Sequence, residues 1–199
     1  SIPTLLDDVS LNVRPGEILG VAGLQGSGSH ELLEGIFGAR ETSAGSVSFE
    51  GKVIGPASPA RSVQAGLALV TSDRKRDGLC LELGIRENLT LASLRDFARA
   101  GGWLRPRQER ASAREAIRNL RVRCRDEEQP VGSLSGGNQQ KVVLGKWLET
   151  KPRVLLLSEP TRGVDIGARQ EIYEWLNRWT TEGGSVVLAS SDLPELLGL

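Results

Sequence analysis

The sequence lacks methionine, has one histidine and two cysteines among its 199 residues, and is only 4% aromatic. Cys80 and Cys124 show neither metal-ligand spacing nor a disulfide framework, so we expect a reducing cytoplasm. No apolar run approaches the length of a membrane span, and no signal peptide is recognisable. Because no methionine marks a natural start, we expect an excised domain.

Charge is balanced, with 25 basic and 25 acidic residues and a net charge of zero. This balance argues against a strongly electrostatic partner such as nucleic acid or an anionic membrane. The length suits one domain with a subdomain, and it is enough to bury a core. The 24 glycines gather where loops are expected, as is usual in an α/β protein with ligand-binding turns.

Apolar strands alternate with helices along most of the chain, which predicts an α/β fold with a mainly parallel sheet. An antiparallel hairpin is expected near the N-terminus, at 46–53. The predicted strands are 18–22, 67–71, 154–158 and 185–189, and the predicted helices are 31–37, 59–65 and 167–181. The middle of the chain shows no convincing strand, but reads as helices at 86–94 and 108–120. We therefore predict a single domain over 1–199, with a helical subdomain inserted at 84–133.

A glycine-rich turn follows the first strand and reads Gly23-Leu24-Gln25-Gly26-Ser27-Gly28-Ser29-His30. A strand before and a helix after are the context that a phosphate-binding P-loop requires. Gly23, Gly26, Ser27 and Gly28 can still cradle phosphates through backbone N–H groups. Ser29 stands at the position of the P-loop lysine and His30 at that of the hydroxyl residue, so the phosphate-binding charge and the usual Mg²⁺ ligand are both missing.

Two simpler interpretations of this turn stay open. It can be a glycine turn that packs a helix onto a sheet and binds nothing. His30 can be a phosphate donor or a general base, or merely a polar residue in the first helical turn, and we favour the last. Glu31, in that same turn, suits the helix dipole but would repel a phosphate there.

A second motif ends the strand 154–158 and continues through Glu159, Pro160 and Thr161. An apolar strand ending in Asp-Glu is the Walker B pattern, in which Asp binds Mg²⁺ through water and Glu orients the attacking water. Here Ser158 takes the Asp position, while Glu159 is the candidate catalytic residue. A strand end with a capping acid is the alternative, and no metal ligand is predicted with assurance.

Between these two motifs lies the run Leu134-Ser135-Gly136-Gly137-Asn138-Gln139-Gln140-Lys141, just before a helix predicted at 138–149. Glycines allow close approach of backbone to a ligand, and a helix N-terminus presents N–H groups and a positive dipole end. Together with the Ser135 hydroxyl they suit a phosphate. An ordinary polar loop that caps a helix is the other interpretation.

Three shorter segments complete the pattern. Asp165 closes the run Arg162-Gly163-Val164-Asp165 and is either a partner contact or the N-cap of the next helix. Ser191 follows the strand 185–189 and can donate one hydrogen bond, although a strand end with a helix cap explains it equally well. The run Ser72-Asp73-Arg74-Lys75-Arg76-Asp77-Gly78-Leu79 is a charged loop.

Taken together, these motifs resemble the ATP-binding cassette (ABC) ATPases, and in particular the bacterial importers of ribose, xylose, galactose and related monosaccharides. The resemblance covers residues 6–197. Asp73-Arg74-Lys75 resembles a segment of the cassettes that drive monosaccharide import. Arg162-Gly163-Val164-Asp165 and Leu193-Pro194-Glu195 are similar to the second, C-terminal cassette of importers that carry two cassettes in tandem. That cassette usually has Arg-Thr-Glu where this sequence has Ser29, His30 and Glu31, so the chain departs even from the altered P-loop of its family.

The resemblance implies a P-loop NTPase (ABC ATPase) core and a pair of cassettes with two composite ATP sites. In one site, a partner cassette's P-loop and Mg²⁺ would hold ATP against Ser135, Gly136, Gly137 and Gln139, the signature motif. In the other, the altered P-loop would bind nucleotide weakly. The implied partners are a second cassette, membrane permease subunits and, indirectly, a sugar-binding protein, at the cytoplasmic face of the bacterial membrane.

Three alternatives remain at this stage. The chain can be a fully catalytic ATPase that uses His30 and Glu159 in an unusual arrangement. It can be a non-transport cassette, although the coiled-coil or basic insertions usual in such proteins are missing from the sequence. It can also be a structural or regulatory cassette without nucleotide turnover.

Overall fold

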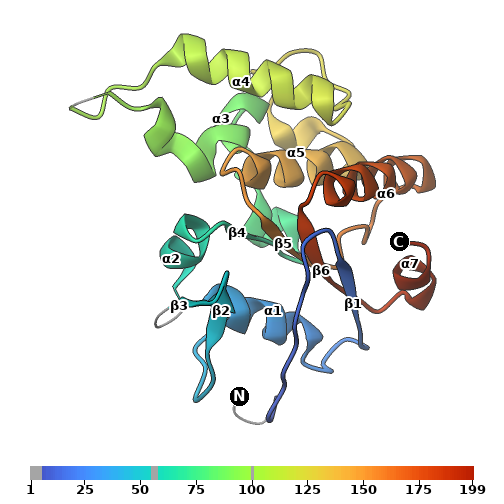
Figure 1. Cartoon of the computed structure of the whole chain (residues 1–199). Helices are drawn as coiled ribbons and strands as arrows, with labels where there is room; N and C mark the ends of the chain where they lie inside the picture. The colour runs from blue at the N-terminus through green and yellow to red at the C-terminus, as the bar shows by residue number, and fades with distance from the viewer. Residues whose placement is uncertain (1–5, 55–57, 100) are drawn as a thin grey trace. The chain divides into compact units, whose positions relative to one another are not determined.

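The computed structural model describes residues 6–54, 58–99 and 101–199, and the chain divides into two units (Figure 1). The first unit comprises the described residues of Ser1–Ser72, Pro152–Pro160 and Leu176–Leu199, and the second those of Asp73–Lys151 and Thr161–Trp175. Each unit is described by itself.

Four parallel strands form the sheet of the first unit, in the order β1-β6-β5-β4 (Figure 1). Their bounds are β1 Ile18–Ala22, β4 Leu67–Val70, β5 Val154–Ser158 and β6 Ser185–Ser190. Both β4 and β6 are buried along their whole length, which explains why their sequences are continuous apolar runs rather than alternating ones. The register pairs Ala22 with Ser190 and Ser158 with Ala189, so the carboxyl ends of β1, β6 and β5 lie level.

Helix α1, Ser29–Phe37, contacts β4, β5 and β6 and buries Leu33 and Phe37. Two shorter helices belong to the same unit, α2 (Pro59–Gln64) and α7 (Leu193–Leu197). The predicted hairpin consists of β2, Val47–Phe49, and β3, Lys52–Ile54. Its turn has positive φ at both central residues, 50° at Glu50 and 75° at Gly51, as tight hairpin turns require.

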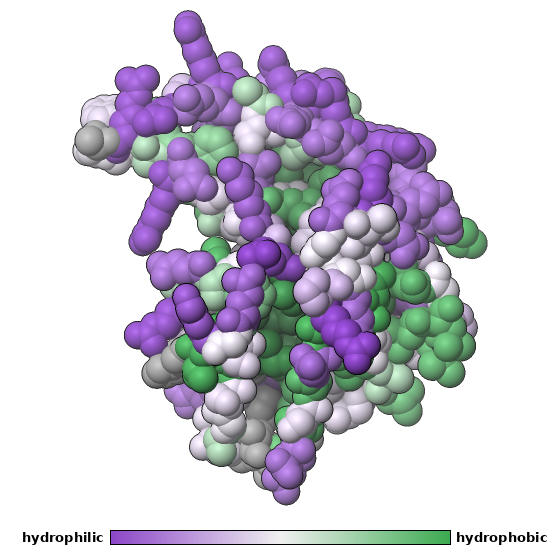
Figure 2. All heavy atoms as spheres, in the orientation of Figure 1, coloured by the Kyte–Doolittle hydropathy of each residue, from purple (hydrophilic) through white to green (hydrophobic). Residues whose placement is uncertain are grey.

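The second unit is helical. Its α-helices are α3 (Ile85–Thr90), α4 (Pro106–Asn119), α5 (Gly136–Leu148) and the first part of α6 (Ile166–Thr181), with short π and 3-10 turns at Arg74–Gly78, Leu91–Phe97 and Val131–Ser133. Helix α3 contacts both α4 and α5. Figure 2 shows hydrophilic side chains gathered over α4, whose buried residues include Ala113 and Ala116. The charged face of α4 is therefore solvated and its small apolar face packs.

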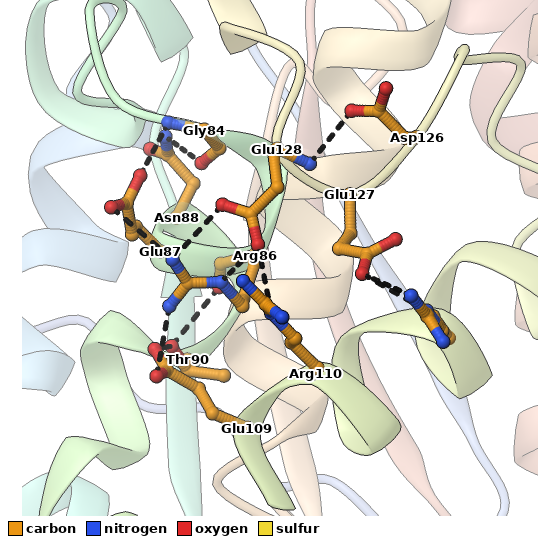
Figure 3. A network of polar contacts seen from close by, with 11 residues as sticks. Gly84, Arg86, Glu87, Asn88, Thr90, Glu109, Arg110, Asp126, Glu127 and Glu128 are labelled. Atoms are coloured by element: carbon orange, nitrogen blue, oxygen red, sulfur yellow. Dashed lines mark hydrogen bonds and ion pairs between the residues drawn. The ribbon is translucent and has the colours of Figure 1, made fainter. Parts of the chain in front are cut away.

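A network of ion pairs holds α3, α4 and the segment before the signature motif together (Figure 3). Arg86 of α3 pairs with Glu109 of α4 at 2.9 Å, and Glu109 is only 2% exposed. Thr90 donates a hydrogen bond to Glu109 at 2.7 Å, so this buried carboxylate is doubly satisfied. Arg86 also donates to Glu128 at 3.0 Å, and Arg110 donates to the same carboxylate at 3.1 Å.

The predicted fold class, α/β with a mainly parallel sheet, an antiparallel portion and added helices, is confirmed. Some element ends differ. The helix predicted at 86–94 becomes α3, which ends at Thr90, followed by a 3-10 segment at Leu91–Phe97 that is interrupted by the non-helical torsion angles of Ser93. Helix α5 begins at Gly136 rather than at 138, since Ser135 is the extended N-cap. In the described ranges, no helix combines the length and apolarity needed to cross a bilayer.

Candidate functional site

The predicted P-loop is a tight turn between β1 and α1. Gly26 and Gly28 have φ of 87° and 93°, values that favour glycine, and the N–H of Ser27 donates to the carbonyl of Leu24 at 2.9 Å. The N–H of Gly23 donates to the carbonyl of Ser190 at 3.2 Å, which fixes the start of the turn to β6. The turn therefore delivers the backbone into the positive end of a nine-residue helix, a shape that suits a phosphate.

The side chains of the turn supply no positive charge, because residues 23–31 include neither lysine nor arginine. Ser29, at the lysine position, is 5% exposed and accepts a hydrogen bond from the hydroxyl of Ser27 at 3.2 Å. Glu31 has a buried Oε2 atom for which the described part of the chain provides no hydrogen-bond partner. The turn thus combines an anion-binding backbone with a side-chain charge of the wrong sign for an anion.

His30 and Ser158 contact each other directly. His30 Nδ1 and Ser158 Oγ are 2.5 Å apart, although the two residues are 128 positions apart in the sequence. Ser158 is 3% exposed and His30 is half-buried, so the bond lies at the inner edge of the turn. The structure therefore joins the residue at the P-loop hydroxyl position to the residue at the Walker B Asp position.

Glu159, the candidate catalytic residue, directly follows β5 in a strained backbone conformation. Its φ is +48°, and its N–H donates to the carbonyl of Ala189 at 2.9 Å. The carboxylate Oε1 accepts the backbone N–H of Ser191 at 2.7 Å. The structure thus brings Glu159, Ser191 and the P-loop to the level carboxyl ends of three neighbouring strands.

In the second unit, the signature motif opens α5. Ser135 is exposed at the N-cap, and its side chain makes no capping hydrogen bond to the helix. The amide nitrogen of Asn138 donates to Ser135 Oγ at 2.9 Å, while Asn138 Oδ1 accepts the N–H of Arg123 at 2.7 Å. No acidic residue occupies the first turn of this 13-residue helix. A hydroxyl oriented by Asn138 and an uncapped helix start can both face a phosphate.

Gln139 does not accompany Ser135 at the surface, although the sequence suggested that it would. Its side chain is 4% exposed and donates to the carbonyls of Val131 and Gly132 at 3.3 and 3.4 Å. The helical position one residue after Asn138 points inward, so Gln139 anchors the segment before the motif. The outward amide belongs to Asn138.

Arg74 links the charged loop to the signature and to the segment before α6. Its guanidinium donates to the carbonyl of Arg162 at 2.7 Å and to that of Gly163 at 3.2 Å. A Cβ on Gly136 would lie 2.7 Å from Arg74 Nη2 and 2.7 Å from the carbonyl oxygen of Gly163, so only glycine fits there. Burial lowers the pKa of Arg74, against the opposing effect of Asp73.

Asp165 caps α6, with Oδ1 accepting the N–H of Ala168 at 2.9 Å, and is exposed. A second tie joins α5 to α6, because Lys141, 3% exposed, pairs with Glu171 and donates to the carbonyl of Arg121 at 3.0 Å. The hydrogen bond from Lys141 lowers the pKa of Glu171. These contacts fix the start of α6 beside the signature helix.

Comparison with known proteins identifies the family. The family model described as "ABC transporter" matches residues 6–162. The chain belongs to the ABC transporter family. It is 48% identical over 195 residues to the ribose import ATP-binding protein RbsA of Geobacillus kaustophilus (strain HTA426), and 45% identical over 193 residues to the protein of that name from Oceanobacillus iheyensis (strain DSM 14371 / CIP 107618 / JCM 11309 / KCTC 3954 / HTE831). These alignments cover 98% and 97% of the chain but 39% of each relative, so the chain spans well under half of their length.

Solved structures support the same fold. A nucleotide-free ATP-binding cassette from an ABC transporter superposes with a TM-score of 0.78 at 23% identity, covering 100% of this chain and 80% of that one. The dimeric post-hydrolysis structure of the cassette MJ0796 bound to ADP and Pi also gives 0.78 at 23% identity, covering 96% and 81%. The predicted ABC ATPase core is confirmed by these similarities.

ABC cassettes in general bind ATP with Mg²⁺. The residues of this P-loop do not fit that ion. Mg²⁺ is ordinarily bound by a P-loop hydroxyl and by the Walker B carboxylate. In this chain those positions hold the imidazole of His30 and the hydroxyl of Ser158, which are hydrogen-bonded to each other. Among the described residues, no three His, Cys, Asp or Glu side chains cluster as a metal site. Mg²⁺ prefers oxygen ligands in octahedral geometry, which this pair does not offer.

Three residues make contacts around the candidate site that the sequence analysis did not predict. Asn138 has a sequence signal, since it lies three positions after Ser135, a spacing at which helix-start side chains meet. Arg74 stands in a recognisable segment, but its contact with Arg162 spans 88 positions and has no local signal. Lys146 is 7% exposed and donates to the carbonyl of Gly78 at 2.6 Å, which only the fold reveals. Burial lowers the pKa of Lys146.

Proposed function

We propose that the chain is a nucleotide-binding domain that energises ABC-type import of a monosaccharide. Its signature residues Ser135, Gly136 and Gly137 would complete the ATP site of a second cassette. Its own P-loop would bind nucleotide weakly and hydrolyse none, so the ATPase activity belongs to the assembled transporter. We also propose that residues 84–133 are a helical subdomain inserted in a single cassette over 1–199.

The relatives support the substrate class and the partners. Both are named ribose import ATP-binding proteins, and the chain spans 39% of their length, which leaves room for a second cassette in a protein of that size. Import further implies permease subunits and, indirectly, a sugar-binding protein, with the cassette at the cytoplasmic face of a bacterial membrane. In such an assembly the chain touches ATP and the permease but no sugar.

One observation supports assigning ATP binding chiefly to the signature motif rather than to the P-loop of this chain. At the signature, Asn138 orients the exposed hydroxyl of Ser135 at 2.9 Å, and the first turn of α5 itself carries no acid, although a Cβ on Gly137 would lie 3.2 Å from Asp165 Oδ2. At the P-loop, by contrast, the side chains at the two metal positions bond to each other at 2.5 Å. At the signature, a phosphate meets the positive partial charge of a helix N-terminus. At the P-loop, it meets side chains that do not suit Mg²⁺ and the acid Glu31 in the following helical turn. The better-equipped anion site is therefore the one that serves the partner.

The roles of the remaining site residues follow. Glu159 would orient water only if nucleotide and metal were present beside it, so we assign it no turnover here. Ser191 would contact the terminal phosphate weakly through its hydroxyl. Asp165, as the cap of α6, would hold the segment that meets the partner cassette in place.

The test uses the whole transporter reconstituted with its permease. Ser135→Arg places a bulky cation where the partner's nucleotide must close, and we expect loss of transport and of the transporter's ATPase activity. Gln170→Arg, exposed on α6, adds the same charge at a site outside the motif and should leave both activities unchanged. Normal transport by Ser135→Arg would refute the composite site.

The second measurement uses the 199-residue chain alone. We expect its ATP hydrolysis to equal the background in Mg²⁺ buffer. Fast Mg²⁺-dependent turnover by the isolated chain would instead support a self-sufficient catalytic site at His30 and Glu159. A structural cassette that binds no nucleotide is the second candidate, favoured by the buried Oε2 atom of Glu31, which has no hydrogen-bond partner among the described residues. Calorimetry with a non-hydrolysable ATP analogue separates it from weak binding.

A further inference from the structure

Two residues that depart from the motif patterns, His30 in the P-loop and Ser158 at the Walker B position, form a hydrogen bond with each other. Replacing a P-loop hydroxyl by His30, or a Walker B Asp by Ser158, would each leave a polar side chain facing a missing partner. In this structure each supplies the partner that the other lacks, Nδ1 to Oγ at 2.5 Å. Ser158 is 3% exposed, so its hydroxyl is satisfied by imidazole rather than by bulk water.

The bond uses the atoms that a cation would need. Mg²⁺ takes oxygen ligands and disfavours imidazole nitrogen, and the hydroxyl oxygen of Ser158 is already hydrogen-bonded to His30. Glu159, the acid that directly follows Ser158, has Oε1 bound to the N–H of Ser191 at 2.7 Å. Recruiting Mg²⁺ would therefore require breaking the His30–Ser158 bond, and the neutral ligands gained would not match the carboxylate that the Walker B pattern provides.

The phosphate-binding backbone is nevertheless retained. Gly26 and Gly28 keep their positive φ, and α1 begins at the end of the turn. Backbone N–H groups and a helix dipole act on a phosphate without a metal. This P-loop therefore keeps the backbone that binds phosphate but lacks the side chains that bind Mg²⁺.

We infer that this P-loop is a magnesium-independent nucleotide site, in which the His30–Ser158 pair takes the place of the cation. The site binds the phosphates of a nucleoside di- or triphosphate through the backbone of residues 23–28, equally well with and without Mg²⁺. The inference rests on the proposed function, since it concerns the nucleotide that the cassette holds without turnover.

The experiment measures binding of a fluorescent ATP analogue to the 199-residue chain, in excess MgCl₂ and in EDTA. For the parent chain we expect the two dissociation constants to agree within about twofold, far below the tenfold that 1.4 kcal/mol would produce. The double variant His30→Thr/Ser158→Asp restores a hydroxyl and a carboxylate. It should bind at least about tenfold more tightly in MgCl₂ than in EDTA.

The control is Ser48→Ala, an exposed serine of β2 outside the P-loop, which should behave like the parent in both buffers. At least tenfold tighter parent binding in MgCl₂ would overturn the inference. If the parent binds no nucleotide in either buffer, weak binding under the proposed function fails. The inference then fails as well, because it requires the parent to hold nucleotide, whereas Mg²⁺-dependent binding by the parent overturns the inference alone and leaves the proposed function standing. A melting curve for each variant confirms that it is folded.

Discussion

The guanidinium of Arg74 donates to the backbone carbonyl of Arg162 at 2.7 Å, which ties a charged surface loop to the segment before α6. The same guanidinium lies beside Gly136 of the signature. Asp73 shapes the loop by accepting the N–H groups of Lys75 and Arg76, both at 3.1 Å. A change at Arg74 would therefore act directly on the signature.

Arg74→Gln should lower turnover of the assembled transporter by about tenfold or more, since hydrogen bonds from charged groups contribute roughly 1.5–3 kcal/mol. The KM for ATP should change little, because Arg74 touches backbone carbonyls rather than nucleotide. Arg74→Lys keeps the charge with one donor group and should fall between. Arg76→Gln, in the same loop with a side chain 82% exposed, is the control. A raised KM with unchanged kcat would contradict this positioning role.

Gly136→Ala should abolish transport while leaving the chain folded. The new Cβ would meet Arg74 Nη2 and the carbonyl oxygen of Gly163 at 2.7 Å each, and a backbone oxygen cannot move aside easily. Gly167→Ala is the matched control, because its Cβ would approach only Asp165 Oδ1, at an ordinary 3.5 Å. That variant lies within α6 and should gain roughly 0.5–1 kcal/mol of stability. Transport assays and chemical denaturation read out the two effects, and normal transport by Gly136→Ala would contradict the close fit.

Ser158→Ala should destabilise the chain by about 1–3 kcal/mol, because it leaves His30 Nδ1 without its partner. His30→Ala should cost a similar amount, and the double variant less than the sum. A coupling energy of about 0.5 kcal/mol or more from this double-mutant cycle would demonstrate the bond in solution. Additive effects of the two substitutions would show that the bond contributes nothing to folding.

Acid should weaken the helical unit. Hydrogen bonding from Arg114 lowers the pKa of Glu127 from its ordinary value of 4.5, and hydrogen bonding from Arg86 does the same for Glu128. A depressed carboxyl pKa contributes stability that is present above the unfolded-state pKa and is lost as pH falls through the folded-state value. We expect the melting temperature to fall below about pH 4.5, and to fall less in Glu127→Gln, which has no charge to lose there. Equal pH profiles for the parent and this variant would exclude a contribution from Glu127.

The sequence predicted the strands well, because buried parallel strands are continuous apolar runs and their ends carry the motif residues. The strand 154–158 agrees residue by residue with β5, and the P-loop, Glu159 and Ser191 gather where strand ends meet. It was harder to predict from the sequence which side chain at the start of a helix points outward. Gln139 and Asn138 are adjacent amides, and only the helix phase distinguishes the buried Gln139 from the half-buried Asn138.

Contacts between distant positions could not be predicted at all. The sequence showed His30 and Ser158 as two separate departures from motif patterns, each weakening the same chemistry. Nothing local indicates that the two side chains satisfy each other across 128 positions. The same limit applies to Arg74, whose acceptors are backbone carbonyls that any residue type would provide.

The backbone of Glu159 keeps a φ of +48°, a conformation that glycine would adopt freely and that costs a larger residue of order 1–3 kcal/mol. That energy is retained although the neighbouring Ser158 has left the metal-binding pattern. The positive φ of Glu159 has a structural consequence that does not depend on hydrolysis, because in this conformation the Glu159 carboxylate accepts a hydrogen bond from the N–H of Ser191. Replacing Glu159 with glycine would relieve this strain but also remove the carboxylate that accepts the N–H of Ser191, so one of the contacts between the ends of β5 and β6 would be lost.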